Sequence, residues 1–216
     1  MQEVVIQNPT KEQFSSYLKA FEYFNDSLFG GELPGVILNF SRKSKKTLGF
    51  FAPKRWQSRE GDQETHEISL NPDHFKEDPK DVMSTLVHEM CHLWDQIQEK
   101  PPTRCYHSKR WGRKMKEVGL YPSATGSPGG KEVGVKMTHY LIEGGAFDLT
   151  YEDMPEEAIL PWLSWSPPDK EKKPKNKNKA KYMCECEKAV WAKPGLGGIR
   201  CDDCGEAFVQ EEAEGD

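Results

Sequence analysis

Apolar residues recur at steps of three and four along residues 79–97, with polar residues between them. This spacing is typical of a helix that packs one side on a core. Pro79 suits the first turn of such a helix, and neither glycine nor proline follows before Pro101. The sequence therefore predicts a largely buried helix, whose apolar stripe consists of Val82, Leu86, Met90, Leu93 and Ile97.

The same spacing predicts two more helices. One starts after Asn8 and ends at Gly30, and the other runs from about Ser108 to Val118 and is closed by Gly119. Three short runs of β-favouring residues, at 36–40, 48–51 and 66–70, predict a three-stranded antiparallel meander.

Beyond these elements, we expect a glycine-rich surface loop from Tyr121 to Gly134 and a strand within residues 135–142. Helices and a short antiparallel sheet together make the predicted fold class α+β.

Two histidines and a glutamate lie on the predicted helix in the order His88-Glu89-x-x-His92. The histidines are one turn apart, roughly 40° around the axis, so both imidazoles can reach one ion. A catalytic zinc keeps one position for water, and the neighbouring carboxylate of Glu89 could take a proton from that water. A pair of hydrogen-bonded core histidines is the alternative, but it explains two histidines beside a carboxylate less well.

A catalytic zinc needs a third protein ligand. His107, at the entrance of the helix that follows, is the natural candidate, and Cys105 is its rival. His139 and Tyr140 could approach the same cleft and stabilise the oxyanion that forms when water attacks a carbonyl. The alternative for these two residues is an ordinary half-buried strand.

A change of composition divides the chain of 216 residues. Residues 169–181, DKEKKPKNKNKAK, hold seven lysines and almost no apolar side chain, which predicts a basic flexible linker. The linker separates a domain at 1–168 from a small module at 182–210, and an acidic tail follows at 211–216. The net charge of −5 points weakly away from nucleic acid, but the positive charge is concentrated in a few segments.

Four of the six cysteines form two pairs near the C-terminus. Cys184-x-Cys186 and Cys201-x-x-Cys204 are fourteen residues apart, which is typical of a zinc ribbon whose four thiolates close a structural site. The first pair is one residue shorter than the usual C-x-x-C. We therefore expect two zinc ions in the chain, one catalytic and one structural.

Basic and aromatic residues near this module suit unpaired bases and phosphates. A protein-docking or scaffold role is the alternative. The candidate DNA contacts are Lys109, Arg110, Arg113, Lys172, Lys173, Lys175, Lys177, Lys179, Trp191 and Lys193.

The N-terminus lacks the basic-then-apolar pattern of a signal peptide, and no apolar run reaches the roughly 18 residues that span a bilayer. We expect a cytoplasmic or DNA-associated protein that is not secreted and has no membrane partner.

These motifs together resemble the SprT-like metallopeptidase family, whose eukaryotic members include the Spartan proteases. The resemblance covers nearly all of residues 24–209. The stretches that carry it are Phe24-Asn25-x-x-Leu28-Phe29-x-Gly31-x-Leu33-Pro34, Gly49-Phe50-Phe51-Ala52-Pro53, His66-Glu67-Ile68-Ser69-Leu70-Asn71, His88-Glu89-Met90-Cys91-His92, His107-x-x-x-Trp111 and Cys184 to Cys204.

The resemblance implies a zincin-like, zinc-dependent endopeptidase with His88, His92 and His107 as ligands and Glu89 as general base. Eukaryotic relatives use DNA as an activator and digest proteins trapped on it. Protein substrates and DNA, single-stranded or junction-containing, are thus the implied partners. The segment 108–110, Ser-Lys-Arg, departs from the small, Gly-containing motif that normally follows the third histidine. The loop before Met137 suggests a bacterial or phage branch.

Two other functions fit the same residues. The chain could be a non-catalytic zinc-containing DNA-binding or transcription-associated factor, which a fourth protein ligand such as Cys105 would favour. It could instead be a metal-dependent hydrolase that acts on a non-protein amide.

Overall fold

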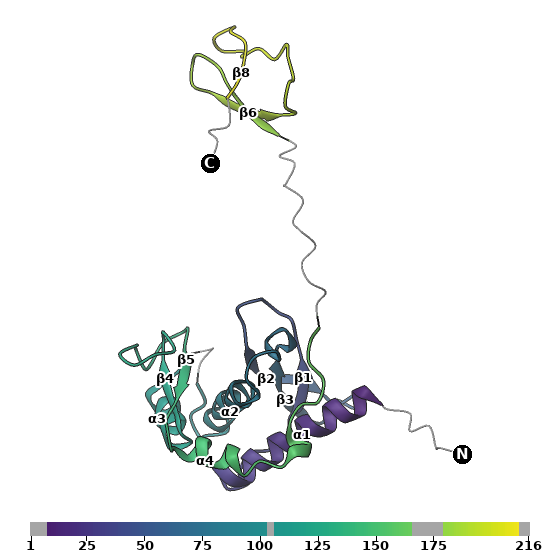
Figure 1. Ribbon diagram of the computed structural model, residues 1–216, viewed down its shortest axis with the longest axis vertical. Coiled ribbons are helices and arrows are strands. Elements are labelled where there is room, and N and C mark those ends of the chain that lie inside the picture. The colour runs from purple at the N-terminus through teal and green to yellow at the C-terminus, as the bar shows by residue number, and fades with distance from the viewer. Residues whose placement is uncertain (1–7, 103–105, 166–178, 212–216) are drawn as a thin grey trace, which may run out of the picture. The chain divides into compact units, whose positions relative to one another are not determined.

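The computed structural model describes residues 8–102, 106–165 and 179–211 (Figure 1). The chain divides into two compact units, 1–165 and 166–216, which are described separately below. Most of the predicted linker lies outside the described residues. Every helix of the described residues is too short or too polar to cross a lipid bilayer.

The first helix, α1 (Pro9–Phe29), has both of its ends fixed by the sequence. The side chain of Asn8 accepts a hydrogen bond from the backbone N–H of Lys11 at 3.0 Å, and Gly30 ends the helix in the left-handed conformation at φ 63°. Tyr17 and Phe24 are fully buried on its inner side. The predicted helix is thus confirmed at both ends.

Three strands form a mixed sheet in the order β1–β3–β2. Their bounds are β1 (Ile37–Phe40), β2 (Gly49–Gln57) and β3 (Glu64–Leu70). β2 pairs antiparallel with β3, but β1 pairs parallel with it, so the predicted antiparallel meander is wrong. The reason is burial: β3 carries the most buried run and takes the centre, which leaves the more exposed β1 and β2 as edges.

The helix predicted over residues 79–97 is α2 (Pro79–Gln96). Asp78 caps its N-terminus by accepting a hydrogen bond from the backbone N–H of Lys80. Leu86, Met90 and Leu93 are fully buried. Figure 1 shows α2 between the three-stranded sheet and the second half of the unit, and it packs against β2, β3 and the helix that follows.

The second half of the unit contains α3 (Lys109–Glu117), β4 (Leu120–Ser123), β5 (Thr138–Leu141) and α4 (Ala146–Glu152). β4 and β5 pair antiparallel. The predicted surface loop is therefore wrong over residues 121–123, where a strand partner far along the chain turns a polar, proline-containing segment into a strand. Single turns of 3₁₀ helix occur at Pro72–His74 and Glu156–Ala158.

The C-terminal unit contains three short antiparallel strands, β6 (Ala180–Met183), β7 (Ala189–Ala192) and β8 (Val209–Gln210), in the order β7–β6–β8. Tyr182 is buried in it and donates a hydrogen bond from its hydroxyl to the carbonyl of Lys193 at 2.7 Å. So small a unit has little apolar core, which makes its cysteine cluster the main candidate for holding it together.

Gly119 joins α3 to β4 at φ 90°, and a Cβ there would lie 2.5 Å from the backbone nitrogen of Phe147. We expect Gly119→Ala to lower the free energy of unfolding by about 4 kcal/mol, because it adds a clash with α4 to the strain of a left-handed residue. Gly129→Ala is the matched control, since Gly129 has φ 85° with nothing within 4 Å, and should cost about 1–2 kcal/mol. Urea unfolding measures both, and equal losses would contradict the predicted clash.

Candidate metal centre

Three histidine side chains converge from two separate segments. His88 and His92 lie on α2, and His107 lies two residues before α3. One ligand atom from each lies within 4.8 Å of the others, and the ring centroids of His92 and His107 are 4.6 Å apart. This spacing could hold one metal ion, and among the described residues the group has three members, which leaves a coordination position for a non-protein ligand.

Backbone pairing holds His107 in place. The N–H of His107 donates to the carbonyl of Gly134 at 2.9 Å, and the N–H of Gly134 donates back at 3.2 Å. The ring Nδ1 of His107 also lies 3.0 Å from the Gly134 carbonyl oxygen. Because a carbonyl only accepts, Nδ1 carries the proton and Nε2 presents its lone pair to an ion.

An ion pair joins the ends of α2 and α3 next to this ligand. Arg110 binds the carboxylate of Asp95 through Nε, and its Nη2 donates to the backbone carbonyls of Asp95 at 3.0 Å and Lys100 at 2.7 Å. Asp95 is 1% exposed and lies one turn after His92. Since Arg110 is three residues after His107, the pair sets the distance between the third ligand and the first two.

Trp111 lies against all three imidazoles. Its ring centroid is 5.1 Å from His88, 5.2 Å from His92 and 4.5 Å from His107. It is fully buried, and its Nε1 has no hydrogen-bond partner among the described residues. The indole therefore gives the three ligands an apolar wall.

Burial keeps the imidazoles neutral. Desolvation lowers the pKa of His92 to about 3, places the pKa of His88 well below its usual value and also lowers that of His107. An unprotonated imidazole is the form that ligates a metal, so these residues fit a cation without first releasing a proton.

Glu89 is 6% exposed and lies between α2 and the edge strand β2. Burial raises the pKa of its carboxyl to about 8, and a backbone hydrogen bond from Phe51 partly opposes the shift. A cation beside it would lower this pKa by attraction. With a cation present the group could ionise at neutral pH, and a carboxylate in an apolar setting is a stronger base than a solvated one.

The C-terminal unit holds a second cluster. The sulfurs of Cys184, Cys186, Cys201 and Cys204 lie within 4.8 Å of one another, and all four are free thiols. The short spacing of the first pair does not prevent convergence, since the Cys184 and Cys186 sulfurs are 3.1 Å apart. Four sulfurs around one point could hold a metal ion and fill its coordination shell.

His139 and Tyr140 are neighbours on β5 with different contacts. His139 contacts His88 through Nδ1, at 3.1 Å, and Ser84 through Nε2, at 2.8 Å, so both of its ring nitrogens face protein atoms. Tyr140, the next residue on β5, stacks on Tyr121 with centroids 5.0 Å apart. The contacts of His139 occupy both of its possible donors, whereas the stacking of Tyr140 leaves its hydroxyl unassigned, so the oxyanion role stays a prediction.

The candidate DNA contacts fall into three groups. Arg110 is engaged with Asp95, whereas Lys109 and Arg113 are exposed on α3. Lys172, Lys173, Lys175 and Lys177 lie outside the described residues. Lys179 and Lys193 are exposed, and Trp191 is 61% exposed on β7. Residues 179–211 carry slightly more carboxylates than basic groups, so the positive charge near this unit comes mainly from the linker sequence.

Sequence reasoning missed three residues that support the ligands, Ser84, Asp95 and Gly134, and it found Trp111 only as part of the motif that begins at His107. Ser84 and Asp95 carry a partial signal, because they lie one turn before His88 and one turn after His92 on the same helix. Gly134 contributes its backbone carbonyl, and no pattern of residue types in a sequence predicts such a contact.

Comparison with known proteins places this site in a family. The model of the SprT-like family matches residues 17–139, a span that contains the sheet, α2, α3 and all three histidines. A Salmonella typhimurium protein described as "Uncharacterized protein in mucB 3'region" is 35% identical over 60 residues, which is 28% of this chain and 80% of that protein. The family match stops before the cysteine cluster.

Replacing Arg110 tests the link between α2 and α3. We expect Arg110→Met to lower the free energy of unfolding of the metal-free protein by about 3 kcal/mol, because it leaves the buried Asp95 carboxylate without its cation. Arg113→Met, on the same helix but exposed, should change it by less than about 0.5 kcal/mol. Chemical denaturation followed by circular dichroism measures both values. Equal midpoints for the two variants would show that the ion pair is dispensable.

Proposed function

The chain belongs to the SprT-like family, and from this premise we propose that it is a zinc-dependent endopeptidase recruited to DNA, where it cleaves bound or crosslinked proteins. The observation that carries the proposal is the convergence of His88, His92 and His107, together with the buried carboxyl of Glu89, the residue that follows His88 on the same helix. The family indicates a metallopeptidase-like activity. The zinc, the peptide substrate and the DNA are our inferences.

The donor set favours zinc. Three neutral imidazole nitrogens with one further position are the usual ligands of a catalytic zinc. When bound, zinc would supply Lewis acidity, which polarises a peptide carbonyl and lowers the pKa of water to about 7. The apolar wall of Trp111 supports this use, because electrostatic interactions are stronger where water is excluded.

Glu89 is placed to move the proton. It follows His88 on α2, and its carboxylate accepts a hydrogen bond from the backbone of Phe51, whose ring stacks on His92 with centroids 6.4 Å apart. Its burial strengthens it as a base. In the proposed reaction, Glu89 takes a proton from the attacking water and then delivers it to the nitrogen of the leaving amine. The hydrogen bond from Phe51 holds the carboxylate on the β2 side of the site.

The edge position of β2 suits an extended substrate. The order β1–β3–β2 leaves one side of β2 without a strand in the described part of the chain, and α2 packs next to it. A polypeptide in extended form can pair with such an edge through backbone hydrogen bonds. Recognition of this kind depends little on the side chains of the substrate, which agrees with a protease whose selectivity comes from tethering.

Tethering would come from basic segments. The seven lysines of residues 169–181 and the exposed Lys109 and Arg113 can contact phosphates, and Trp191 offers an exposed ring for stacking on an unpaired base. We infer a preference for single-stranded or junction-containing DNA on this ground. Binding would raise the local concentration of the enzyme around any protein attached to the same DNA.

The activity is tested by Glu89→Gln. We expect the variant to keep its fold and both metals but to cleave a protein–DNA conjugate about 10²–10⁴-fold more slowly, because it lacks the general base. Glu77→Gln is the control, since Glu77 is exposed and pairs with His74 rather than with the ligands. Fragments are compared by gel for the conjugate and for the same protein free. Undiminished cleavage by Glu89→Gln would remove Glu89 from this role, and slow cleavage of the conjugate relative to the free protein would contradict recruitment.

The role of the C-terminal segment is tested by deleting residues 170–216. We expect weaker DNA binding and a flatter dependence of log K on log salt, because each lost phosphate contact removes about 0.7–0.9 from the slope. Replacing only Lys172, Lys173, Lys175 and Lys177 by glutamine keeps the cysteine cluster and should reproduce most of the change in slope. Filter binding at several salt concentrations measures both. An unchanged slope would assign another task to this segment.

A further inference from the structure

A series of hydrogen-bonded polar side chains begins at Nδ1 of His88. Ser84 is one turn before His88 on α2, and His139 reaches both residues from β5. This hydrogen-bonded series ends on α2 itself, where the hydroxyl of Ser84 donates to the backbone carbonyl of Asp81 at 2.8 Å. Ser84 is 3% exposed, so these contacts have little access to water.

The carbonyl acceptor at the end of this series fixes the direction of every hydrogen bond in it. The Asp81 carbonyl can only accept, so the Ser84 hydroxyl donates to it and its oxygen accepts from Nε2–H of His139. A neutral imidazole carries one proton, which leaves Nδ1 of His139 as an acceptor. The atom that faces it, Nδ1 of His88, must then be the donor.

We propose that Ser84 and His139 are positioning residues that hold His88 in its Nδ1-protonated tautomer. In this tautomer Nε2 of His88 has a free lone pair with which it can bind the metal. This inference rests on the proposed function, because it concerns a ligand of the same site. It reassigns His139 from a group near the substrate to a group that acts through His88.

The opposite tautomers would disable the ligand. If His139 carried its proton on Nδ1, it would donate to Nδ1 of His88 and move the His88 proton to Nε2, where it blocks metal binding. In that arrangement the Ser84 hydroxyl would have to donate to Nε2 of His139 and give up its hydrogen bond to the Asp81 carbonyl, which makes the arrangement unfavourable. Removal of the Ser84 hydroxyl, which is linked to the ion only through His139 and His88, should therefore weaken metal binding.

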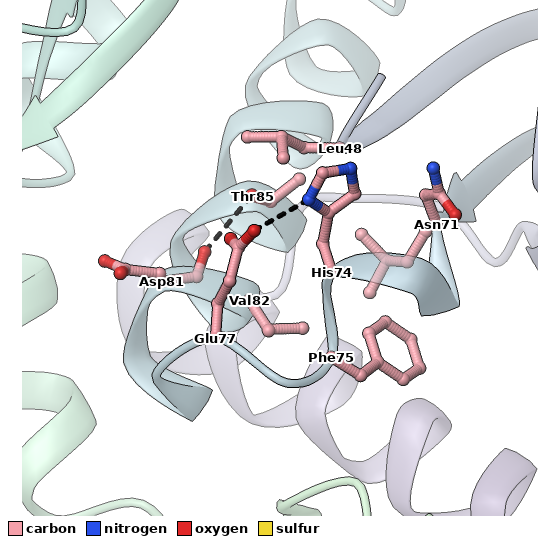
Figure 2. A pocket seen from close by; sticks show the side chains of 9 residues that line it. Leu48, Asn71, His74, Phe75, Glu77, Asp81, Val82 and Thr85 are labelled. Atoms are coloured by element: carbon pink, nitrogen blue, oxygen red, sulfur yellow. Dashed lines mark hydrogen bonds and ion pairs between the residues drawn. The ribbon is translucent and has the colours of Figure 1, made fainter. Parts of the chain in front are cut away.

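Thr85 provides a matched control. Its hydroxyl donates to the same Asp81 carbonyl at 3.1 Å, but the side chain lies towards the small pocket lined by His74, Glu77 and Val82 (Figure 2). Thr85→Val removes that hydroxyl with little change of shape, and Ser84→Ala does the same for its neighbour. A general effect on the first turns of α2 would appear in both variants.

His139 also has a matched pair. In His139→Asn the amide oxygen can take the place of Nδ1 and accept from His88, whereas His139→Leu removes the acceptor altogether. The asparagine variant should retain most of the function of His139. Rescue by asparagine separates a hydrogen-bonding role from simple packing between β5 and α2.

The experiment measures cobalt(II) binding by the full-length chain and its four variants. Cobalt at the cysteine cluster gives intense thiolate charge-transfer bands, whereas cobalt at the histidines gives only weak ligand-field bands, so the two sites titrate separately. We expect Ser84→Ala and His139→Leu to weaken binding at the histidines about 10–100-fold without changing the cysteine site. Thr85→Val and His139→Asn should bind within about threefold of the parent chain. Long-range ¹H–¹⁵N spectra of the histidine rings should show His88 protonated at Nδ1 in the metal-free parent chain.

Three results would count against these inferences. Equal binding by the parent chain, Ser84→Ala and His139→Leu would overturn the positioning role and leave the proposed function standing. Equal losses in Ser84→Ala and Thr85→Val would overturn it too, since helix integrity would then explain both. A parent chain that binds cobalt only at the cysteines would instead overturn the proposed function.

Discussion

The site depends on how α2 packs against the segment that begins α3. Two of the ligands lie on one helix and are placed by its geometry alone, but the third arrives from a separate segment. The buried pair of Asp95 and Arg110 and the backbone bridge from His107 to Gly134 bring that segment to a fixed distance from α2. Without this docking, α2 would present two histidines and a glutamate but not the group of three histidines that could hold a metal ion.

Burial then decides the chemistry of the side chains that this docking brings together. The indole of Trp111 lies against all three imidazoles, and their burial lowers the pKa of each, which keeps them neutral. The same loss of solvent raises the pKa of Glu89. One apolar environment therefore favours both neutral imidazoles and a strong base, as the proposed hydrolytic site would require.

The two clusters of potential ligands are suited to different tasks. The histidine cluster has three members among the described residues and lies in the larger unit, next to an unpaired sheet edge. The cysteine cluster has four members in a unit with few buried side chains. Three ligands leave room for a reaction, whereas four leave none and can replace the missing apolar core.

The sequence by itself determined the local elements and the ligand types. Proline and asparagine at the start of α1, glycine at its end and the apolar stripe of α2 are signals within one or two turns, so they could be interpreted without knowledge of the fold. The histidine and cysteine spacings identified both clusters for the same reason, because His88 and His92, and each cysteine pair, lie within a few residues.

Only the tertiary structure decided which distant segments meet. Strand order depends on burial across the whole sheet, so the parallel pairing of β1 with β3 could not be deduced from three similar apolar runs. His139 has no spacing relation to His88, and only the fold brings the two rings together. Contacts of this kind depend on the fold as a whole, since the free energy that stabilises them comes from the burial of many residues elsewhere in the chain.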